Sequence, residues 1–468
     1  MNVLCGTLHI QTMLPPPFLR QMQALLGDEY PAFITAMQEP PPVSIRRNPG
    51  KIPDTSTWSF HGTLAPAPWH PDALFLEQRP VFTLDPLFHA GAYYVQEASS
   101  MFLHEALRQT VDFSKNLRIL DLCAAPGGKS TLLASLLNEQ SLLVSNEVIR
   151  QRVGVLRENM EKWGYPNIAV TSAEAGEFAA LDGWFDVIVA DAPCSGEGLF
   201  RKDPGAVQEW SPANVELCAG RQRRILADVL PALAPGGVLA YSTCTYNRQE
   251  DDENVEWLQK TFNLELVTLD VPPDWHIVRT PGGGYQFYPH RLRGEGFFIA
   301  LFHKKDGSPG KNVPPARFKN IQPLSKKQAP ALAGWLNPAF EASFFETPNG
   351  DVLALPAALE PEYRLLDGVL KNKWFGVNTG SFKGQDFIPS HALALSCQVS
   401  PTLPGIDFSR EQALRFLKKE VFDLPAGAPQ KGWALARFGY LNLGWLKIVP
   451  NRWNNYLPQE RRIRMELG

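Results

Sequence analysis

DLCAAPGGK, residues Asp121 to Lys129, joins an apolar segment at residues 117–122 to a segment with helical periodicity at residues 129–137. Small residues in such a turn allow a cofactor to approach the backbone, and the amino end of the following helix favours the carboxylate of an amino-acid moiety. The turn is not a phosphate-binding P-loop, because Cys123 stands where that motif requires glycine. We therefore expect a nucleotide-type cofactor pocket here, with an ordinary tight strand–helix connection as the alternative.

The sequence around this turn alternates strands and helices from about residue 85 to residue 305. The expected strands are Leu117–Leu122, Leu142–Asn146, Ile168–Thr171, Phe185–Asp191 and Gly237–Ser242, with Phe297–Phe302 as a further candidate, and the expected helices are Lys129–Leu137, Val148–Trp163, Asn214–Leu233 and Asp251–Thr261. Continuous apolar strands between amphipathic helices are typical of a parallel sheet covered on both faces. The expected fold class is α/β, with a doubly wound, mainly parallel sheet that binds ligands beyond the carboxyl ends of its strands.

Two cysteines, fifty positions apart, end two of these strands. Cys194 closes the strand that ends in Asp191, and Cys244 closes the strand that ends in Tyr241-Ser242-Thr243. Both thiols therefore face the same edge of the sheet as the glycine turn. A thiolate that adds to carbon 6 of a pyrimidine makes carbon 5 nucleophilic, so that one difficult methyl transfer becomes two easier steps. Two thiols at one pocket divide the work between nucleophile and release group; the alternative for Cys194 is an inert buried cysteine.

Charged residues near the predicted strand ends suit a nucleoside cofactor and a nucleic-acid substrate. Glu147 ends the second strand, about 20 residues beyond the turn, and suits a ribose diol. Glu174 follows the third strand and is expected to reach an adenine amino group, whereas Asp191 offers an acceptor to a cytosine amino group. Arg201 and Lys202 add positive charge beside an incoming nucleic-acid strand.

A second acidic feature follows Cys244. The run Glu250–Glu253 is expected to begin a helix, where carboxylates favour the positive end of the helix dipole, and we interpret it as structural.

A thiolate needs nearby positive charge, and Lys129 joins Arg201 and Lys202 as a candidate source of it.

Composition excludes several classes of protein. The 468 residues carry a formal net charge of −3, so nucleic-acid binding has to come from local basic patches. Six cysteines without a C-x-x-C pair indicate neither a disulfide framework nor a zinc site, and we expect no metal and a reducing, cytoplasmic location. No apolar run approaches the ~20 residues of a membrane span, and no secretory signal is recognisable.

The chain is expected to divide into four parts. Residues 1–84 form an N-terminal subdomain, with translation starting at Met1 or at Met13; residues 85–305 form the α/β domain; residues 306–328 form a basic linker; and residues 329–468 form a C-terminal module, in one piece or two. The last 38 residues hold seven basic residues against two acidic ones, and Trp453 and Tyr456 lie among them. This composition favours RNA binding by Arg452, Arg461, Arg462 and Arg464.

Several motifs together resemble the Nop/Sun family of RNA cytosine-5 methyltransferases, and within it the bacterial RsmF (YebU) type. The matching pieces are Gln96-Glu97-Ala98-Ser99-Ser100-Met101, Asp121 to Lys129, Asp191 to Gly198, Arg201-Lys202-Asp203-Pro204, Tyr241 to Thr245 and Glu295-Gly296-Phe297-Phe298. The resemblance is clear from residue 13 to residue 305 and looser beyond. It implies a Rossmann-like class I methyltransferase domain with a small N-terminal extension and a C-terminal α+β, PUA-like module that binds RNA.

The resemblance also assigns roles to residues. It implies S-adenosylmethionine as cofactor, Cys244 as nucleophile and Cys194 as release group, with Lys129 and Asp191 in contact with the target base. DNA cytosine-5 methyltransferases use the Pro-Cys thiol as nucleophile instead, and Thr243-Cys244-Thr245 argues for the RNA type. Glu174 departs from the family pattern, which usually has Asp there. The implied cofactor pocket comprises Cys123, Ala124, Ala125, Pro126, Gly127, Gly128, Lys129, Glu147, Glu174 and Asp191.

The implied substrate is cytosine in small-subunit ribosomal RNA, within a subunit or an assembly intermediate, and the implied enzyme is a monomer. Two other functions stay open. The same chemistry on transfer RNA is compatible with the catalytic residues. A ribosome-assembly protein that binds RNA without turnover is the other alternative, and the intact set of Cys194, Cys244, Asp191 and Lys129 argues against it.

Overall fold

The structure is a computed structural model that describes residues 14–52, 58, 64–305, 307, 310, 313–450 and 452–465. Met1 and Met13, the two candidate start residues, and Lys311 of the predicted basic linker lie outside the described residues.

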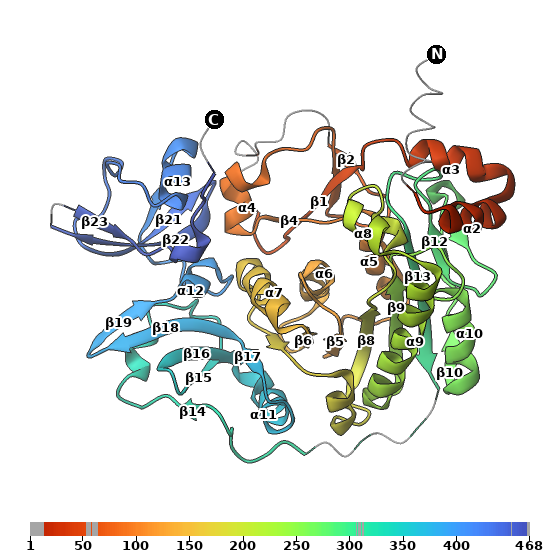
Figure 1. Cartoon of the computed structure of the whole chain (residues 1–468). Helices are drawn as coiled ribbons and strands as arrows, with labels where there is room; N and C mark the ends of the chain where they lie inside the picture. Colours follow the sequence, from red (N-terminus) through yellow and green to blue (C-terminus); the bar gives the residue numbers. More distant parts are fainter. Residues whose placement is uncertain are drawn as a thin grey trace.

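A ten-stranded sheet forms the centre of the molecule (Figure 1), in the order β11-β12-β13-β9-β8-β5-β6-β7-β17, and β10 pairs with β13. Its five middle strands are parallel: β5 (Arg118–Asp121), β6 (Leu142–Asn146), β7 (Ile168–Thr171), β8 (Phe185–Asp191) and β9 (Leu233–Thr243). The order of the strands reverses at β5: β6 and β7 follow on one side of it, and β8 and β9 lie on its other side. This is the topological switch point, where doubly wound sheets bind their ligands.

The remaining strands of this sheet lie at its two sides. Antiparallel pairing joins β13 (Phe297–Lys304) to β9, and β10 (Leu264–Leu266), β11 (Val278–Arg279) and β12 (Tyr285–Phe287) follow on that side. At the opposite side β17 (Lys373–Phe375), from the C-terminal part of the chain, pairs antiparallel with β7. A segment two hundred residues away in sequence therefore completes the sheet.

Helices cover both faces of the sheet, as the alternating pattern predicts. One hydrophobic cluster includes Leu132 of α6 (Gly128–Leu136) and Leu156 of α7 (Arg150–Trp163). The other includes Leu226 of α9 (Pro212–Val229) and Leu258 of α10 (Asp252–Thr261). The predicted bounds of β6, β7 and β8 are confirmed.

The prediction of a helix reaching Leu233 is wrong. The α-helix α9 ends at Val229, a 3-10 turn spans Leu230–Ala232, and β9 begins at Leu233 rather than at Gly237. Pro231 has no N–H to donate to a preceding helical turn, so the helix cannot continue through it.

The N-terminal part places a small antiparallel sheet beside the central domain. Its strand order is β2-β3-β1-β4. The helices are α2 (Pro16–Leu26), α3 (Tyr30–Ala36), α4 (Pro86–Ala90) and α5 (Leu103–Arg108), and the strands are β1 (Val43–Arg47), β2 (Ala65–Pro66), β3 (Ala73–Leu76) and β4 (Tyr93–Val95).

The C-terminal part contains two further sheets. The first has the order β14-β15-β16-β18-β19 and comprises β14 (Gln322–Pro323), β15 (Ala342–Glu346), β16 (Asp351–Pro356), β18 (Val377–Lys383) and β19 (Asp386–Pro389), with α11 (Glu360–Val369) and α12 (His391–Leu395). The second comprises β20 (Gly405–Asp407), β21 (Gly432–Phe438), β22 (Leu441–Val449) and β23 (Arg452–Asn455), with α13 (Arg410–Leu417).

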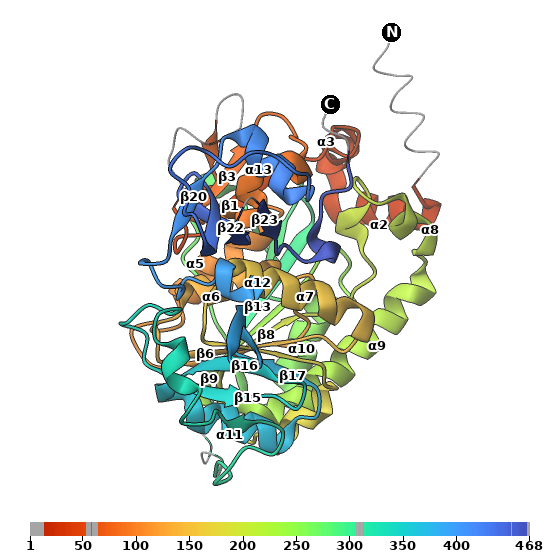
Figure 2. The same ribbon diagram turned by 90° about the vertical axis from the view of Figure 1, so that its left-hand side faces the viewer.

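The last sheet shares a hydrophobic core with the N-terminal part. Ile45, Leu87 and Tyr93 belong to the same buried cluster as Ala434 and Leu446, and Figure 2 shows β20 and β22 lying close to β1 and β3. Part of the N-terminal region, residues 43–95, thus packs against the last sheet of the chain. Within the described ranges, no helix combines the length and apolarity of a membrane span.

Candidate active site

The glycine turn follows β5 at the switch point and leads into α6. Gly127 adopts φ 118°, a left-handed conformation that favours glycine. Three side chains donate to carbonyl groups of the turn: Asn146 to Leu122 at 3.1 Å, Arg152 to Ala125 at 2.5 Å and Asn159 to Pro126 at 2.8 Å. These three residues were missed by sequence analysis, because polar residues after a strand or on a helix usually face solvent. Their contacts fix the shape of the turn.

Two carboxylates lie beside this turn. Glu147 follows β6 and is 3% exposed; its Oε1 accepts from the Ile149 N–H at 2.8 Å and its Oε2 lies 3.3 Å from Arg152 Nη1. Asp121, at the end of β5, accepts from Ser130 Oγ at 2.6 Å with Oδ2, while Oδ1 has no hydrogen-bond partner among the described residues. Burial raises the pKa of Asp121 to about 7. An unpartnered buried acceptor at this position suits a ligand that brings a donor.

Glu174 lies at the edge of the same region. It is exposed, and its backbone N–H donates to the Glu177 carboxylate at 3.0 Å at the start of the 3-10 helix Ala175–Ala180. The carbonyl of the neighbouring Ala173 accepts from Asn146, which also donates to the glycine turn at Leu122. Glu174 therefore follows a residue that is linked to the turn through Asn146.

The two strand-end thiols lie against each other. Cys194 Sγ and Cys244 Sγ are 2.8 Å apart, and both residues are free and half-buried. The hydrogen bond with Cys244, together with burial, raises the pKa of Cys194 well above its ordinary value. The contact with Cys244 and burial thus favour the protonated form of Cys194, and either sulfur atom can be the donor in the bond between them.

The loops that carry the thiols are tied to each other by crossed hydrogen bonds. The Gly198 N–H donates to the Cys244 carbonyl at 2.7 Å, and the Tyr246 N–H donates to Glu197 Oε2 at 2.8 Å. A third bond, like the first, runs from the Cys194 loop to the segment after Cys244: the Ser195 N–H donates to Glu250 Oε2 at 3.0 Å. The separation of the two sulfur atoms is thus set by contacts from both loops.

The acidic run after Cys244 has two different roles. Asp252 and Glu253 lie in the first turn of α10, as predicted. Glu250 is buried and also accepts from Gln222 at 2.7 Å, while Asp251 Oδ1 accepts from Thr243 Oγ1 at 2.6 Å and from Thr245 Oγ1 at 3.0 Å. Both carboxylates thus brace the thiol loops. Sequence analysis missed this role because four consecutive acids resemble an exposed helix start.

Lys129 and Asp191 form an ion pair beside the thiols. Lys129 Nζ lies 2.8 Å from Asp191 Oδ2, and Ser242 Oγ donates to Asp191 Oδ1 at 2.7 Å. Burial lowers the pKa of Lys129, but the carboxylates of Asp191 and Asp121 more than offset it, so the pKa lies above the ordinary value. Lys129 is therefore charged, and Cys244 is among the groups with which that charge interacts.

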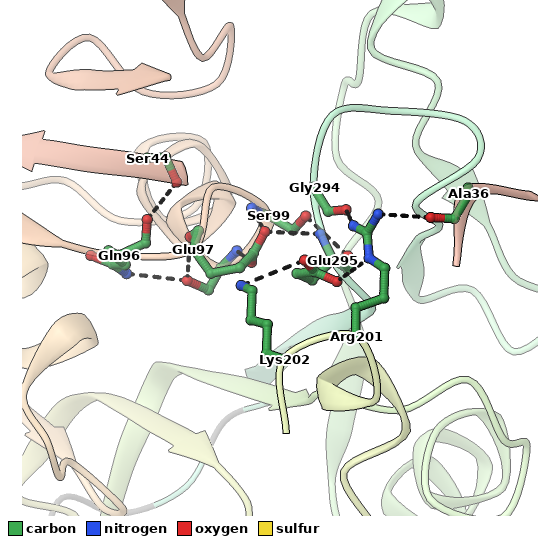
Figure 3. Close-up of polar contacts among 10 residues, drawn as sticks. Ala36, Ser44, Gln96, Glu97, Ser99, Arg201, Lys202, Gly294 and Glu295 are labelled. Carbon is green, nitrogen blue, oxygen red and sulfur yellow. Dashed lines mark hydrogen bonds and ion pairs between the residues drawn. The ribbon is translucent and has the colours of Figure 1, made fainter. Parts of the chain in front are cut away.

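The residues expected to bind RNA differ in their surroundings. The Arg201 side chain is 4% exposed and donates to Glu295 Oε2, the Ala36 carbonyl and the Gly294 carbonyl (Figure 3), whereas the Lys202 side chain is 32% exposed. Arg461 is 19% exposed and pairs with Glu158 and Glu161 of α7. Arg452, Arg462 and Arg464 are exposed. Within the described residues, no group of three His, Cys, Asp or Glu side chains is arranged to hold a metal ion.

The parallel strand order around the switch point, the glycine turn after the first strand and the acid after the second define a class I methyltransferase. Three family models match this chain: 16S rRNA methyltransferase RsmB/F over residues 108–303, the N-terminal domain of 16S rRNA methyltransferase RsmF over residues 14–98, and the methyltransferase RsmF PUA domain over residues 404–463. The chain belongs to the ribosomal RNA small subunit methyltransferase F (RsmF) family.

Relatives of nearly full length support this assignment. A ribosomal RNA small subunit methyltransferase F from Shewanella loihica is 31% identical over 92% of this chain and 90% of its own length, and one from Escherichia coli is 30% identical over 95% and 96%. A methyltransferase homologue from Pyrococcus horikoshii has a similar structure, with a TM-score of 0.52 and 28% identity over 61% of this chain and 93% of its own. NSun6 from the same organism, at 20% identity over 63% of this chain and 99% of its own with a TM-score of 0.52, shares the fold.

Proposed function

We propose that this chain transfers a methyl group from S-adenosylmethionine to carbon 5 of cytosine in small-subunit ribosomal RNA, through a covalent bond between Cys244 and carbon 6 of the base. The observation that carries the proposal is the pair of sulfur atoms 2.8 Å apart at the sheet edge beside the Lys129–Asp191 ion pair. The relatives of nearly full length are named for small-subunit ribosomal RNA, which supports that substrate over transfer RNA.

The residues around the glycine turn fit S-adenosylmethionine. Residues 123–128 present backbone and small side chains, and the free amino end of α6 suits a carboxylate. Glu147 would accept from ribose hydroxyl groups, and Asp121 Oδ1 has no hydrogen-bond partner among the described residues; Glu174 and Asp191 complete the proposed pocket. The bound cofactor would supply an electrophilic methyl group on its sulfonium sulfur.

The side chains around the thiols suit each step of the base chemistry. Cys244, as a thiolate stabilised by Lys129, forms a bond to carbon 6, and the electron pair of the carbon 5–carbon 6 double bond then makes carbon 5 the nucleophile for the methyl group. Asp191 and Lys129 hold the base. A base then takes the carbon 5 proton, the electron pair of that carbon–hydrogen bond restores the double bond, and the carbon–sulfur bond breaks. The sulfur of Cys244 leaves as a thiolate, to which the Cys194 thiol can donate its proton. The raised pKa of Cys194 supports this division, because a protonated Cys194 is not the attacking group.

We propose the four-part organisation that composition predicts, with two boundaries moved: the N-terminal part extends past residue 84 to beyond β4, which pairs with β1, and the basic linker ends before β14, which pairs with β15. RNA would be bound by the C-terminal module and the basic linker. The enzyme would act as a monomer in the cytoplasm. Ribosomal targets are structured, so the target base has to leave its stack before it reaches the thiols.

The direct test is methyl transfer from labelled S-adenosylmethionine to naked ribosomal RNA, assembled small subunits and transfer RNA in parallel, followed by nucleoside analysis. We expect labelled 5-methylcytidine in ribosomal material alone. Label in transfer RNA would keep the chemistry and reject the substrate. Absence of label everywhere, with cofactor binding intact, would favour the assembly-protein alternative.

A second prediction concerns the exposed arginines at the C-terminal end. Replacing Arg452, Arg462 and Arg464 together with alanine should weaken RNA binding and reduce the slope of log K against log salt by about 2, since each phosphate contact contributes about 0.7–0.9. Arg461 is left in place because Glu158 and Glu161 already neutralise it. Arg221 and Arg224, exposed on α9, provide the matched control. An unchanged salt slope in the triple variant would reject these arginines as phosphate contacts.

A further inference from the structure

Three sequence motifs with no role in the chemistry above meet at one buried residue, Glu295 (Figure 3). The Glu295 N–H donates to Glu97 Oε1 at 2.9 Å, and the Glu295 carbonyl accepts from Ser99 Oγ at 3.1 Å. The Glu295 carboxylate accepts from Arg201 Nε at 2.9 Å with Oε2 and lies 3.6 Å from Lys202 Nζ with Oε1. Glu97 and Ser99 belong to the N-terminal extension, so Glu295 joins that extension to the loop that follows Cys194.

Each nitrogen of the Arg201 guanidinium makes one of these contacts. Besides Glu295, its guanidinium donates to the Ala36 carbonyl at 3.0 Å and to the Gly294 carbonyl at 2.7 Å. The side chains of Arg201 and Glu295 are only 4% and 3% exposed, so removing one charge leaves the other buried without its partner. Arg201 therefore holds the end of α3 and the segment leading into β13, and three of its N–H groups are used in doing so.

The backbone next to this pair touches the thiol loops. A Cβ atom on Gly198 would lie 2.4 Å from the Gly296 carbonyl oxygen and 3.0 Å from the Cys244 carbonyl oxygen. Gly198 is thus confined between the residue that follows Glu295 and the nucleophile itself. Cys194 lies in the same loop, which Glu250 holds at Ser195 and Glu295 holds at Arg201.

We propose that Glu295 is a positioning residue for the release step, acting through Arg201 to keep the Cys194 loop against Cys244. Glu250 is the anchor at one end of that loop and Glu295 is the anchor at the other. The N-terminal extension takes part in catalysis through this contact, since Ala36, Glu97 and Ser99 complete it. The inference rests on the proposed function, because it assumes that Cys194 assists release of the methylated base.

The test is Glu295→Gln in the full-length protein, with methyl transfer followed in both single-turnover and multiple-turnover conditions. Glutamine keeps the size of the side chain and removes its charge. We expect the first turnover to be nearly unchanged and later turnovers to slow about tenfold to a hundredfold, the range that a misplaced catalytic group produces. We also expect covalent protein–RNA adduct on denaturing gels although Cys194 is intact. Adding Cys244→Ala to Glu295→Gln should abolish that adduct.

Glu29→Gln is the matched control. Glu29 pairs with Arg291 and His290. Like Glu295, this contact joins the N-terminal extension to the segment before β13, but it does not involve the Cys194 loop. It should turn over like the unaltered protein and leave no adduct. A second variant, Arg201→Lys, keeps the charge but loses the three-way donor fork and should repeat the Glu295→Gln result.

The outcomes separate this inference from the proposed function. Normal later turnovers and no adduct in both variants would overturn the role of Glu295, as would equal losses of first and later turnovers. Failure of both variants to fold would assign the cluster to stability alone and would also overturn the inference. Absence of adduct in Cys194→Ala would instead reject the proposed release mechanism.

Discussion

Replacing Cys244 with alanine is expected to reduce 5-methylcytidine formation at least about a thousandfold, because no other group in the site can form the bond to carbon 6. Cys194 lies 2.8 Å away, but its contact with Cys244 and burial raise its pKa and Glu250 holds its loop, so we do not expect it to substitute as nucleophile. The measurement is labelled methyl incorporation at saturating cofactor. Cofactor and RNA affinity, measured separately, should be nearly unchanged, since the sulfur lies outside the glycine turn and the basic C-terminal surface.

The control for this variant is Cys218→Ala. Cys218 is a buried cysteine of α9 whose sulfur faces Asn214 rather than the thiol pair. It should retain methyl transfer, which shows that loss of a buried thiol alone does not inactivate the protein. Retained methylation in Cys244→Ala, together with its loss in Cys194→Ala, would reverse the two assigned roles.

The central sheet could be predicted from sequence because its signals are local. The strands β6, β7 and β8 are mainly apolar runs between helical segments, and such runs are typical of strands buried on both faces. The glycine turn and both cysteines follow strands directly, so the topology of a parallel sheet places them at one edge. For these features, the local sequence was sufficient to predict the position in the fold.

Contacts between distant segments could not be predicted in this way. No local pattern indicates that β17 pairs with β7, because the sequence of a three-residue strand does not specify which strand it pairs with. Arg201 and Arg461 illustrate the same limit for charges. Both were expected at an RNA surface, yet Arg201 is buried against Glu295, and Arg461 pairs with acids of α7 three hundred residues away. Basic residues look alike in sequence whether their partner is phosphate or carboxylate.

The family motifs identified the segments that meet at Glu295, but they did not predict the contacts between those segments. Glu97, Arg201 and Glu295 all lie in motifs that carried the resemblance, but a motif does not state which of its members touch each other. Their convergence depends on the packing of the N-terminal extension against β13. Asn146, Arg152 and Asn159 show the same point at the glycine turn, where the side chains that shape the loop come from the next strand and helix.

Replacing Cys194 with alanine is expected to trap the enzyme on its RNA. The first methyl transfer should proceed, because Cys244, Lys129 and Asp191 are intact and Lys129 keeps its charge. Release should then slow, because the protonated thiol that faces the Cys244 sulfur is gone. Denaturing gels of enzyme mixed with labelled RNA and cofactor should show a covalent adduct, and multiple-turnover methylation should fall at least about a hundredfold.

Two comparisons decide the meaning of that adduct. The double variant with Cys244→Ala should show none, because the adduct needs the carbon–sulfur bond that only Cys244 forms. Nucleoside analysis of the trapped RNA should find the methyl group already on carbon 5, since Cys194 acts after methyl transfer. An adduct that carries unmethylated cytosine would place Cys194 before the transfer, and an adduct formed by Cys244→Ala alone would make Cys194 the nucleophile. Because the two sulfur atoms lie within one hydrogen bond of each other, the order of events rather than their distance distinguishes the two roles.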